Sequence, residues 1–332
     1  MKISASIYSN STNDLISSVK DLIEHKVDLL HVDCNDDMSV FEDMQKIKSI
    51  TNMPLDLHII STDIDKYFPK IQHNTPAFVT YQYENLNPLI KDFPRFENCR
   101  NGLAITSETP VNVFEKYAHC CDFILIMATT PGKSGGSFNK ENFKKIREFK
   151  SLYPDKRVHV DGGVNGEVSF ILRNMGVYAA VSGSYLFKEK SIGLSLLNLK
   201  TFDTESHYKV KDFMMTNGEI PLLPAEKNSL LDVLQTIEKY KMGFCISVDE
   251  SNNLLGIISN ADIRKAMIKN YSSLDNIKAD NMLNKHPVYI EEEATVADMI
   301  RLIKSKNFPV SYLPVVNRSK QISGAVTFMN LV

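Results

Sequence analysis

Histidine and aspartate residues recur two positions apart in three short apolar segments of the chain. His31 and Asp33 form one such pair, Asp56 and His58 form a second, and Asp161 ends a third segment. If these segments are strands, side chains two residues apart lie on the same face of the sheet. Two imidazoles and several carboxylates on one face suit a divalent transition metal. The same spacing is compatible with buried structural residues, so the pattern alone leaves both interpretations open.

Glycine-rich turns follow three of the apolar segments. Two glycines follow Asp161, and Gly183 lies between two serines. In barrels of parallel strands, the loops after the last two strands often bind phosphate through backbone N–H groups. A third cluster, residues 129–137, contains Gly-Lys-Ser, but a nucleotide-binding P-loop requires a glycine five positions before Gly132, where Met127 stands. We therefore reject a P-loop and retain a glycine-rich loop that contacts phosphate.

The elements that must position these residues alternate regularly between residues 2 and 184. Short apolar runs bounded by turn residues are separated by amphipathic stretches such as residues 14–25, whose aliphatic side chains fall on one helical face. Eight such units predict an α/β fold, a compact (β/α)₈ TIM barrel with its catalytic groups at the carboxyl ends of the strands. A doubly wound sheet would give a similar alternation. The predicted strands are KISASIY, LLHVDC, PLDLHII, AFVTYQY, GLAIT, FILIMAT, RVHVDGG and AAVSGS.

The pattern of apolar and polar residues changes after residue 198. Residues 199–212 are polar without a clear period, and we predict that they link domains at residues 1–198 and 213–332. Two similar blocks follow, each with an apolar start, a helix (Leu230–Tyr240 or Val296–Lys306) and two strands joined by a polar turn. An internal repeat of this length predicts a module with pseudo-twofold symmetry.

Composition and charge exclude several classes of function. The chain has 332 residues, of which 43% are hydrophobic, and a formal net charge of −2. It therefore has no excess of positive charge for a nucleic acid, and we predict no nucleic-acid partner. We predict no membrane span, because no apolar run of about 18 residues occurs, and no secretory signal. Five cysteines without a pattern indicate reduced thiols and a cytoplasmic protein.

Seven segments of the first half resemble ribulose-phosphate 3-epimerases in order and spacing. They are KISASI, LHVDCNDD, LDLHII, GLAITSETP, LIMATTPGKSGGSF, VDGGVN and VSGSYLF, and they cover about residues 2–190. The resemblance implies a TIM barrel that moves a proton at C3 of a ketopentose 5-phosphate. It implies one divalent metal per chain, which we expect to be Zn²⁺ with Fe²⁺, Mn²⁺ or Co²⁺ as alternatives, held by His31, Asp33, His58 and Asp161.

The resemblance also assigns residues to the reaction and to the substrate. Asp33 and Asp161 match the acid–base pair that acts on opposite faces of the sugar, and inversion by proton transfer requires one base on each face. A metal at the substrate's O2 and O3 would stabilise the enediolate. The implied contacts to substrate are Ser6, Met127 and the glycine-rich loop with Gly135 and Gly136, and the implied phosphate-binding N–H groups are those of Gly162, Gly163, Gly183 and Ser184.

Several substrate-facing positions depart from the family pattern. Residues 35–37 are Asn-Asp-Asp where the family has Met-Asp-Gly, Ile60 replaces a methionine, Gln82 replaces a histidine and Gly136 replaces a glutamine. We predict that 3-epimerase chemistry is retained on a sugar phosphate of the ribulose 5-phosphate/xylulose 5-phosphate type. Asn35 could accept an additional or differently oriented hydroxyl, so a six- or seven-carbon ketose phosphate of surface-sugar biosynthesis is one alternative. A non-catalytic sugar-phosphate or nucleotide sensor is the other.

The repeat in the second half resembles a tandem CBS pair, an α+β (Bateman) domain. The segment GIISNADIR carries the resemblance, and GAVTFMNL is its weaker mate. In such pairs a Ser/Thr-x-x-Asp pattern contacts a ribose diol. Ser259 and Asp262 match it, whereas Thr327 and Asn330 match it in part, so we expect at most one good site.

The segment MMTNGEIPLLP resembles the approach to the CBS pair of arabinose-5-phosphate isomerases. The resemblance implies a nucleotide or nucleotide sugar as a regulatory ligand, with a pair used only for dimerisation as the alternative. Because such barrels and CBS pairs both self-associate, we expect a homo-oligomer.

Overall fold

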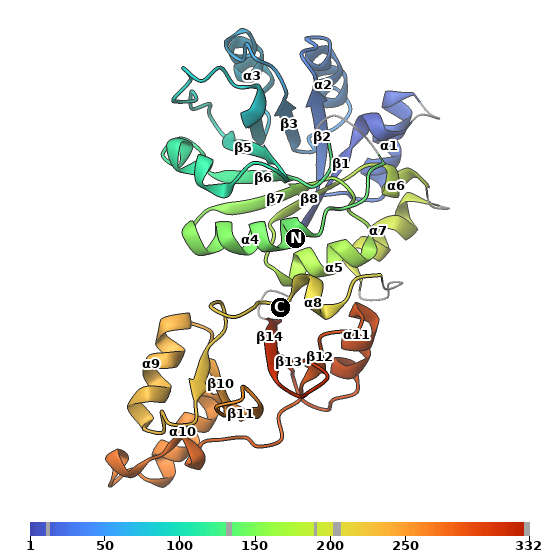
Figure 1. Ribbon diagram of the computed structural model, residues 1–332. Coiled ribbons are helices and arrows are strands. Elements are labelled where there is room, and N and C mark those ends of the chain that lie inside the picture. Colours follow the sequence, from blue (N-terminus) through green and yellow to red (C-terminus); the bar gives the residue numbers. More distant parts are fainter. Residues whose placement is uncertain (11–13, 131–134, 189–190, 202–206, 329–332) are drawn as a thin grey trace. The chain divides into compact units, whose positions relative to one another are not determined.

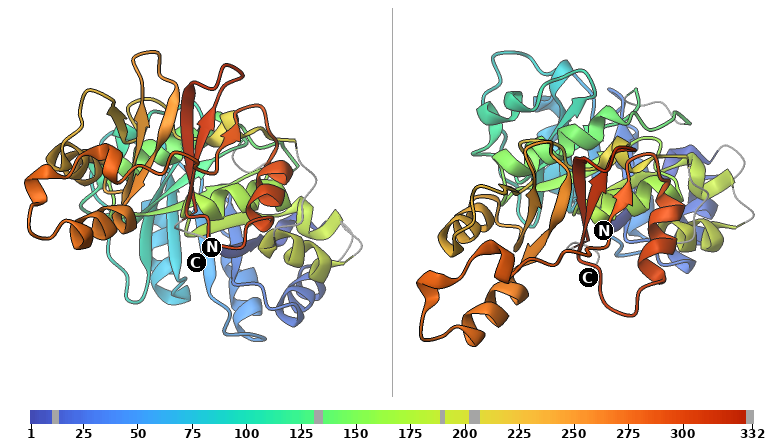
Figure 2. Two further views of the ribbon diagram at one scale, coloured as in Figure 1. Left: turned by 90° about the horizontal axis from the view of Figure 1, so that it is seen from below. Right: turned by 60° about the horizontal axis from the view of Figure 1, so that its bottom comes forward.

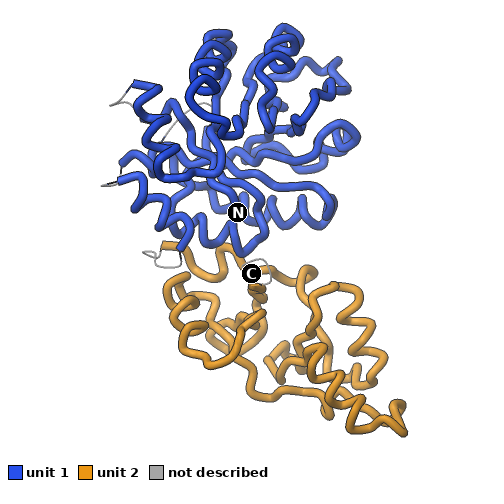
Figure 3. The backbone as a smooth tube through the Cα atoms, turned by 180° about the vertical axis from the view of Figure 1, so that it is seen from behind, with its two compact units in different colours: residues 1–205, 331 blue, residues 206–330, 332 orange. Residues whose placement is uncertain are grey.

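The computed structural model describes residues 1–10, 14–130, 135–188, 191–201 and 207–328. The chain forms two compact units that divide after residue 205 (Figure 3). Each unit is described by itself below. The predicted domain boundaries at residues 198 and 213 remain predictions.

The first unit is a closed barrel of eight parallel strands (Figure 1). Each strand pairs with the next one along the chain, and β8 pairs with β1 to close the sheet. The predicted (β/α)₈ barrel is therefore confirmed, and a doubly wound open sheet is excluded. The strands are β1 (Lys2–Ser6), β2 (Leu29–Cys34), β3 (Leu55–Ile59), β4 (Phe78–Gln82), β5 (Arg100–Thr106), β6 (Phe123–Met127), β7 (Arg157–Asp161) and β8 (Ala179–Ser182).

Helices connect these strands and cover the outside of the barrel (Figure 1). The helix predicted at residues 14–25 begins where the Asp14 side chain accepts a hydrogen bond from the Ser17 N–H at 3.1 Å. After β4 and after β5 the structure has short 3₁₀ helices, η3 (Tyr83–Asn85) and η4 (Val111–Tyr117). The other helical elements are η1 (Ile7–Ser9), α1 (Leu15–Glu24), α2 (Val40–Lys48), η2 (Asp65–Tyr67), α3 (Phe68–Asn74), α4 (Glu141–Leu152), α5 (Gly166–Asn174), α6 (Ser184–Lys188) and α7 (Ile192–Lys200).

The strand register places the polar residues at defined levels of the barrel. His31 pairs with Asp56 across β2 and β3, and Asp33 pairs with His58 one level closer to the carboxyl ends. Asp161 is the last residue of β7. Because all strands run in the same direction, these residues gather at one mouth of the barrel.

Deeper in the barrel the interior is mostly apolar, but Ser4, Asp56 and His159 are buried polar side chains there. His159 of β7 is buried and its ring lies 4.1 Å from the Phe123 ring and 5.4 Å from the Tyr178 ring, measured between centroids. Its Nε2 has no hydrogen-bond partner among the described residues. Burial lowers the pKa of His159 to about 4, so the ring is neutral at neutral pH.

The second unit consists of two similar halves, as the internal repeat predicts. One half has a sheet of order β11-β10-β9 and the other a sheet of order β12-β13-β14. In each half the middle strand pairs antiparallel with one neighbour and parallel with the other. Figure 2 shows the two sheets beside each other. The elements are α8 (Val210–Phe213), β9 (Leu222–Pro224), α9 (Leu230–Tyr240), β10 (Phe244–Val248), β11 (Leu254–Ser259), α10 (Asn260–Lys269), η5 (Leu274–Asn276), η6 (Ala279–Asn281), β12 (Ile290–Glu291), α11 (Val296–Lys304), β13 (Tyr312–Val316) and β14 (Ile322–Thr327).

The two halves share a core and a way of starting helices. The Phe244 and Tyr312 rings stack at 4.1 Å between centroids, and apolar residues of both sheets pack around them. The helices α9, α10 and α11 each begin with a Ser/Thr–Asp capping box, in which two side chains each accept a hydrogen bond from the other residue's backbone N–H. The boxes are Ser229–Asp232 at α9, Ser259–Asp262 at α10 and Thr295–Asp298 at α11. Among the described residues, no helix has the length and apolar character needed to cross a membrane.

Candidate active site and metal centre

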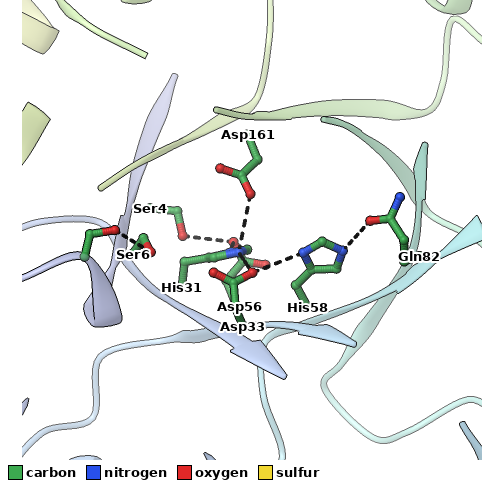
Figure 4. A network of polar contacts seen from close by, with 9 residues as sticks. Ser4, Ser6, His31, Asp33, Asp56, His58, Gln82 and Asp161 are labelled. Carbon is green, nitrogen blue, oxygen red and sulfur yellow. Dashed lines mark hydrogen bonds and ion pairs between the residues drawn. The ribbon is translucent and has the colours of Figure 1, made fainter. Parts of the chain in front are cut away.

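Four potential metal ligands converge at the carboxyl ends of β2, β3 and β7 (Figure 4). His31, Asp33, His58 and Asp161 each contribute one donor atom, and these atoms lie within 4.8 Å of one another. His31 Nε2 is 3.3 Å from Asp33 Oδ1 and 3.8 Å from Asp161 Oδ2. His58 Nδ1 is 3.3 Å from the same Asp33 oxygen. The structure thus brings together the residues that the i, i+2 spacing of the sequence places on one face.

Burial and neighbouring charges give the carboxyl groups of Asp33 and Asp161 different pKa values. Burial raises the pKa of Asp33, but His31 outweighs it and holds this pKa far below the usual range. Burial raises the pKa of Asp161 to about 6 against the pull of His31, and the negative charge of Asp33 adds to the increase. Burial lowers the pKa of His31, but Asp33 and Asp56 hold it well above the usual range. Asp33 is therefore ionised, while Asp161 takes up a proton readily.

The buried Asp56 orients His31 from below. Its Oδ2 lies 3.0 Å from His31 Nδ1 and accepts a hydrogen bond from the Ser4 hydroxyl at 2.9 Å. This contact turns His31 Nε2 toward Asp33 and Asp161. A carboxylate behind a histidine that faces a cation is a common arrangement at metal sites, because it fixes the ring and its tautomer.

Gln82 and Glu84 orient His58 from the side. Gln82 Oε1 lies 2.8 Å from His58 Nε2, and Gln82 Nε2 donates to Glu84 at 2.5 Å. Glu84 also accepts from the Thr106 N–H at 2.9 Å and from the Thr109 hydroxyl. These hydrogen bonds outweigh burial and lower the pKa of Glu84, so that it acts only as an acceptor. The amide oxygen of Gln82 must then face His58, which leaves His58 Nδ1 free to face the cluster.

This donor set fits a divalent transition metal. Two imidazoles that each turn one nitrogen toward the cluster, together with two carboxylates, suit zinc, iron, manganese or cobalt. The His31 and His58 side chains are fully buried, and those of Asp33 and Asp161 are 19% and 17% exposed. Two carboxylates so close together in a buried site repel each other unless a cation or a proton lies between them.

The residues predicted to bind phosphate lie at the same end of the strands. Gly162 and Gly163 follow β7 directly, with φ of +105° and +66°. A Cβ on Gly163 would lie 2.2 Å from the Phe138 backbone nitrogen, so only glycine fits there. Gly183 and Ser184 follow β8, where α6 begins.

The predicted substrate contacts also lie at this end of the strands, and Ser6 and Met127 are the last residues of β1 and β6. Met127 is buried, whereas Asn35 is exposed just after β2. The Ser6 hydroxyl accepts a hydrogen bond from Ser9 at 3.1 Å. Residues 131–134 of the glycine-rich loop lie outside the described residues, while Gly135 and Gly136 precede α4.

In the second unit, the predicted ligand residues end equivalent strands. Ser259 pairs with Phe244 across β11 and β10, and Thr327 pairs with Tyr312 across β14 and β13. The stacked Phe244 and Tyr312 rings therefore link the two positions. Asn330 lies outside the described residues. The capping boxes show that the Ser/Thr-x-x-Asp pattern also has a purely structural use in this unit.

The barrel can be placed among known proteins. Residues 2–187 match the model of the ribulose-phosphate 3-epimerase family. The chain belongs to this family. A ribulose-phosphate 3-epimerase of Bacillus subtilis (strain 168) is 26% identical over 200 residues, which cover 56% of this chain and 92% of the relative. One of Buchnera aphidicola subsp. Baizongia pistaciae (strain Bp) is 25% identical over 214 residues, covering 60% of this chain and 93% of the relative. The epimerase-like barrel is thus matched over nearly the whole length of these relatives.

The second unit of this epimerase family member matches the CBS domain model twice, at residues 210–269 and 279–332. A crystal structure of CBSX2 in complex with AMP aligns with 38% of this chain and 93% of its own, at 21% identity and a TM-score of 0.33. The predicted tandem CBS pair is confirmed by the family match. The likeness of its approach segment to arabinose-5-phosphate isomerases remains a prediction.

Proposed function

We propose that the barrel is a metal-dependent 3-epimerase of a ketose phosphate of the ribulose 5-phosphate/xylulose 5-phosphate type. The pairing of Asp33 with Asp161 carries this proposal. The two carboxyl groups come from β2 and β7 and differ in proton affinity, one ionised and the other with a pKa of about 6. Inversion at C3 removes a proton from one face and delivers one to the other, so such a pair supplies both a base and an acid.

In one direction of the proposed reaction, Asp33 takes the C3 proton, and the electrons of the C–H bond form the C2–C3 double bond of an enediolate. Asp161 then delivers its proton to the opposite face of C3. The reverse direction exchanges the two roles. His31, Asp33, His58 and Asp161 would hold a divalent metal, which we expect to be Zn²⁺ with Fe²⁺, Mn²⁺ or Co²⁺ as alternatives, and its positive charge would stabilise the enediolate oxygens.

The remaining predicted residues hold the substrate in this proposal. Backbone N–H groups at Gly162, Gly163, Gly183 and Ser184 bind the phosphate, since turns and helix starts after the last strands of a barrel offer such groups. Ser6, Met127, Gly135 and Gly136 contact the sugar. The exposed Asn35 faces the part of the substrate that differs between ketose phosphates, and Asn35→Met is expected to change the ratio of kcat/KM values between five- and longer-carbon substrates.

Solvent exchange tests the proposal directly. Ribulose 5-phosphate and six- and seven-carbon ketose phosphates are incubated with the metal-loaded protein in D₂O, and loss of the C3 proton signal is followed by NMR. Wild type is expected to exchange this proton, and Asp161→Asn to slow the exchange about 10²- to 10⁴-fold. Asp155→Asn, which changes an exposed carboxylate of the same unit, is the matched control. Absence of exchange in wild type with every substrate would favour the non-catalytic sensor.

We further propose that the CBS pair binds a nucleotide or nucleotide sugar at Ser259 and Asp262, with Thr327 at the equivalent position of the other half. The match to the CBS family supports this, as does the position of Ser259 at the end of β11 with Asp262 in the first turn of the following helix α10. Calorimetric titration with adenine nucleotides and nucleotide sugars is expected to show binding that Asp262→Asn weakens. Asp232→Asn is the matched control, because it makes the same change in the equivalent capping box at α9. Equal affinity in both variants would leave dimerisation as the role of the pair, and light scattering tests the expected homo-oligomer.

A further inference from the structure

The amino-terminal mouth of the barrel, at the opposite end of the strands from Asp161, contains a cavity. Its volume is about 580 Å³. Lys2, Arg100 and Arg157 line it, and they are the first residues of β1, β5 and β7. Because parallel strands all begin at one end of a barrel, three cations that are far apart in the sequence meet at this mouth. Nothing in the acid–base site uses them.

The positive charge of this cavity is not balanced by its acidic residues. The lining includes a fourth cation, Arg95, which pairs with the Asp122 carboxylate at 2.9 Å. Within the described part of the chain, Lys2, Arg100 and Arg157 form no ion pair with a carboxylate. Like charges gathered in a concave site focus a positive potential and raise the local concentration of anions.

An aromatic ring holds two of the cations in place. The Arg157 guanidinium carbon lies 4.0 Å from the centroid of the Tyr178 ring, and Lys2 Nζ lies 5.7 Å from the same centroid. The face of an aromatic ring attracts a cation without neutralising its charge. The N–H donors of Arg157 are therefore not consumed by a carboxylate, and Tyr178 and Phe78 give the cavity an apolar wall.

We propose that this amino-terminal mouth binds a small polyanion that carries phosphate groups. Guanidinium groups present paired donors that match phosphate oxygens, and two arginines with a lysine around one cavity give several charge-assisted hydrogen bonds. The volume lies within the range of small-molecule sites, about 300–1,000 Å³. Bound phosphate would supply the negative charge that the lining lacks.

Calorimetric titration of the full chain with inorganic pyrophosphate tests this proposal. The double variant Arg100→Gln/Arg157→Gln is expected to bind pyrophosphate at least tenfold more weakly than wild type. Lys20→Gln/Lys144→Gln, which removes two exposed lysines of the same unit, controls for net charge. Equal affinity in wild type and the arginine variant overturns the proposal, as does an equal loss in the lysine variant.

Three further measurements keep the test independent of folding and of the other proposals. Arg157→Lys keeps the charge but not the paired donors, and an affinity between those of wild type and Arg157→Gln is expected. Asp161→Asn should retain the pyrophosphate binding even if the epimerase proposal fails. A mononucleotide and a sugar bisphosphate are titrated in the same way, and the compound whose affinity falls in the arginine variant identifies the source of the phosphate.

Discussion

Replacement of Gln82, whose amide hydrogen-bonds His58, should weaken metal binding although no metal ligand is changed. In Gln82→Leu the His58 imidazole loses the amide oxygen that lies 2.8 Å from its Nε2, and the Nε2–H is left buried without this acceptor. Leaving such a donor unsatisfied costs about 1–3 kcal/mol. The ring can also adopt the other tautomer, in which a proton on Nδ1 blocks the ligating lone pair. Loss of a hydrogen bond to the outer side of a metal ligand lowers metal affinity about 10- to 100-fold. This factor corresponds to about 1.4–2.7 kcal/mol, within the cost of the unsatisfied donor.

Competition with a chromophoric zinc chelator measures this affinity directly. Thr80→Val is the matched control, because Thr80 lies two residues earlier on the same strand and is buried, and its hydroxyl has no hydrogen-bond partner among the described residues. Its zinc affinity should equal that of wild type. If Gln82→Leu binds zinc as tightly as wild type while His58→Ala does not, the argument that Gln82 sets the His58 tautomer is refuted.

Three other changes have defined outcomes. The pKa of His159 is about 6.5 in the unfolded chain and about 4 in the folded protein, so the free energy of unfolding should fall by about 3 kcal/mol as the pH drops through this window. His159→Phe should lose this pH dependence in urea unfolding at several pH values. If the stability of wild type and of this variant changes equally with pH, the expectation is wrong. Gly163→Ala forces a Cβ against the Phe138 backbone and should raise KM for the sugar phosphate and lower the unfolding midpoint, whereas an unchanged KM would argue against phosphate binding there. Ser229→Ala removes the α9 cap and should cost about 1 kcal/mol in urea unfolding, with exposed Ser251→Ala as the neutral control.

The barrel and the shared face of its polar residues are predictable from the sequence because both follow from simple periodicity. Alternation of apolar runs with amphipathic stretches gives the strands, and the two-residue spacing of His31 and Asp33 or of Asp56 and His58 puts their side chains on one face. The carboxyl ends of parallel strands then meet at one mouth. Spacing therefore places His31, Asp33, Asp56 and His58 on one face, whereas the choice of His31, Asp33, His58 and Asp161 as the ligand set follows from the resemblance to the family.

The partners of these ligands are harder to predict. Glu84 stands two residues after Gln82, a spacing that could have suggested contact, but its other hydrogen bonds come from Thr106 and Thr109, after the next strand. Gln82 therefore looks in the sequence like a lost histidine, although it still presents an acceptor to His58 in the structure. The cations of the amino-terminal mouth are equally hidden, because a charged residue at the start of a strand is unremarkable until the sheet closes.

The capping box at α10 affects more than the start of a helix. Asp262 Oδ2 accepts from the Ser259 N–H at 3.0 Å and from its hydroxyl at 2.5 Å, whereas the nearest cation to Oδ1, Lys265, is 4.0 Å away. The side chain has thus lost its rotational freedom before any ligand arrives, and fixing a free side chain on binding costs about 0.5–1.5 kcal/mol. A nucleotide hydroxyl meeting Oδ1 would find a carboxylate that is already oriented. The Ser259 hydroxyl can therefore influence ligand affinity through entropy alone, even where it never touches the ligand.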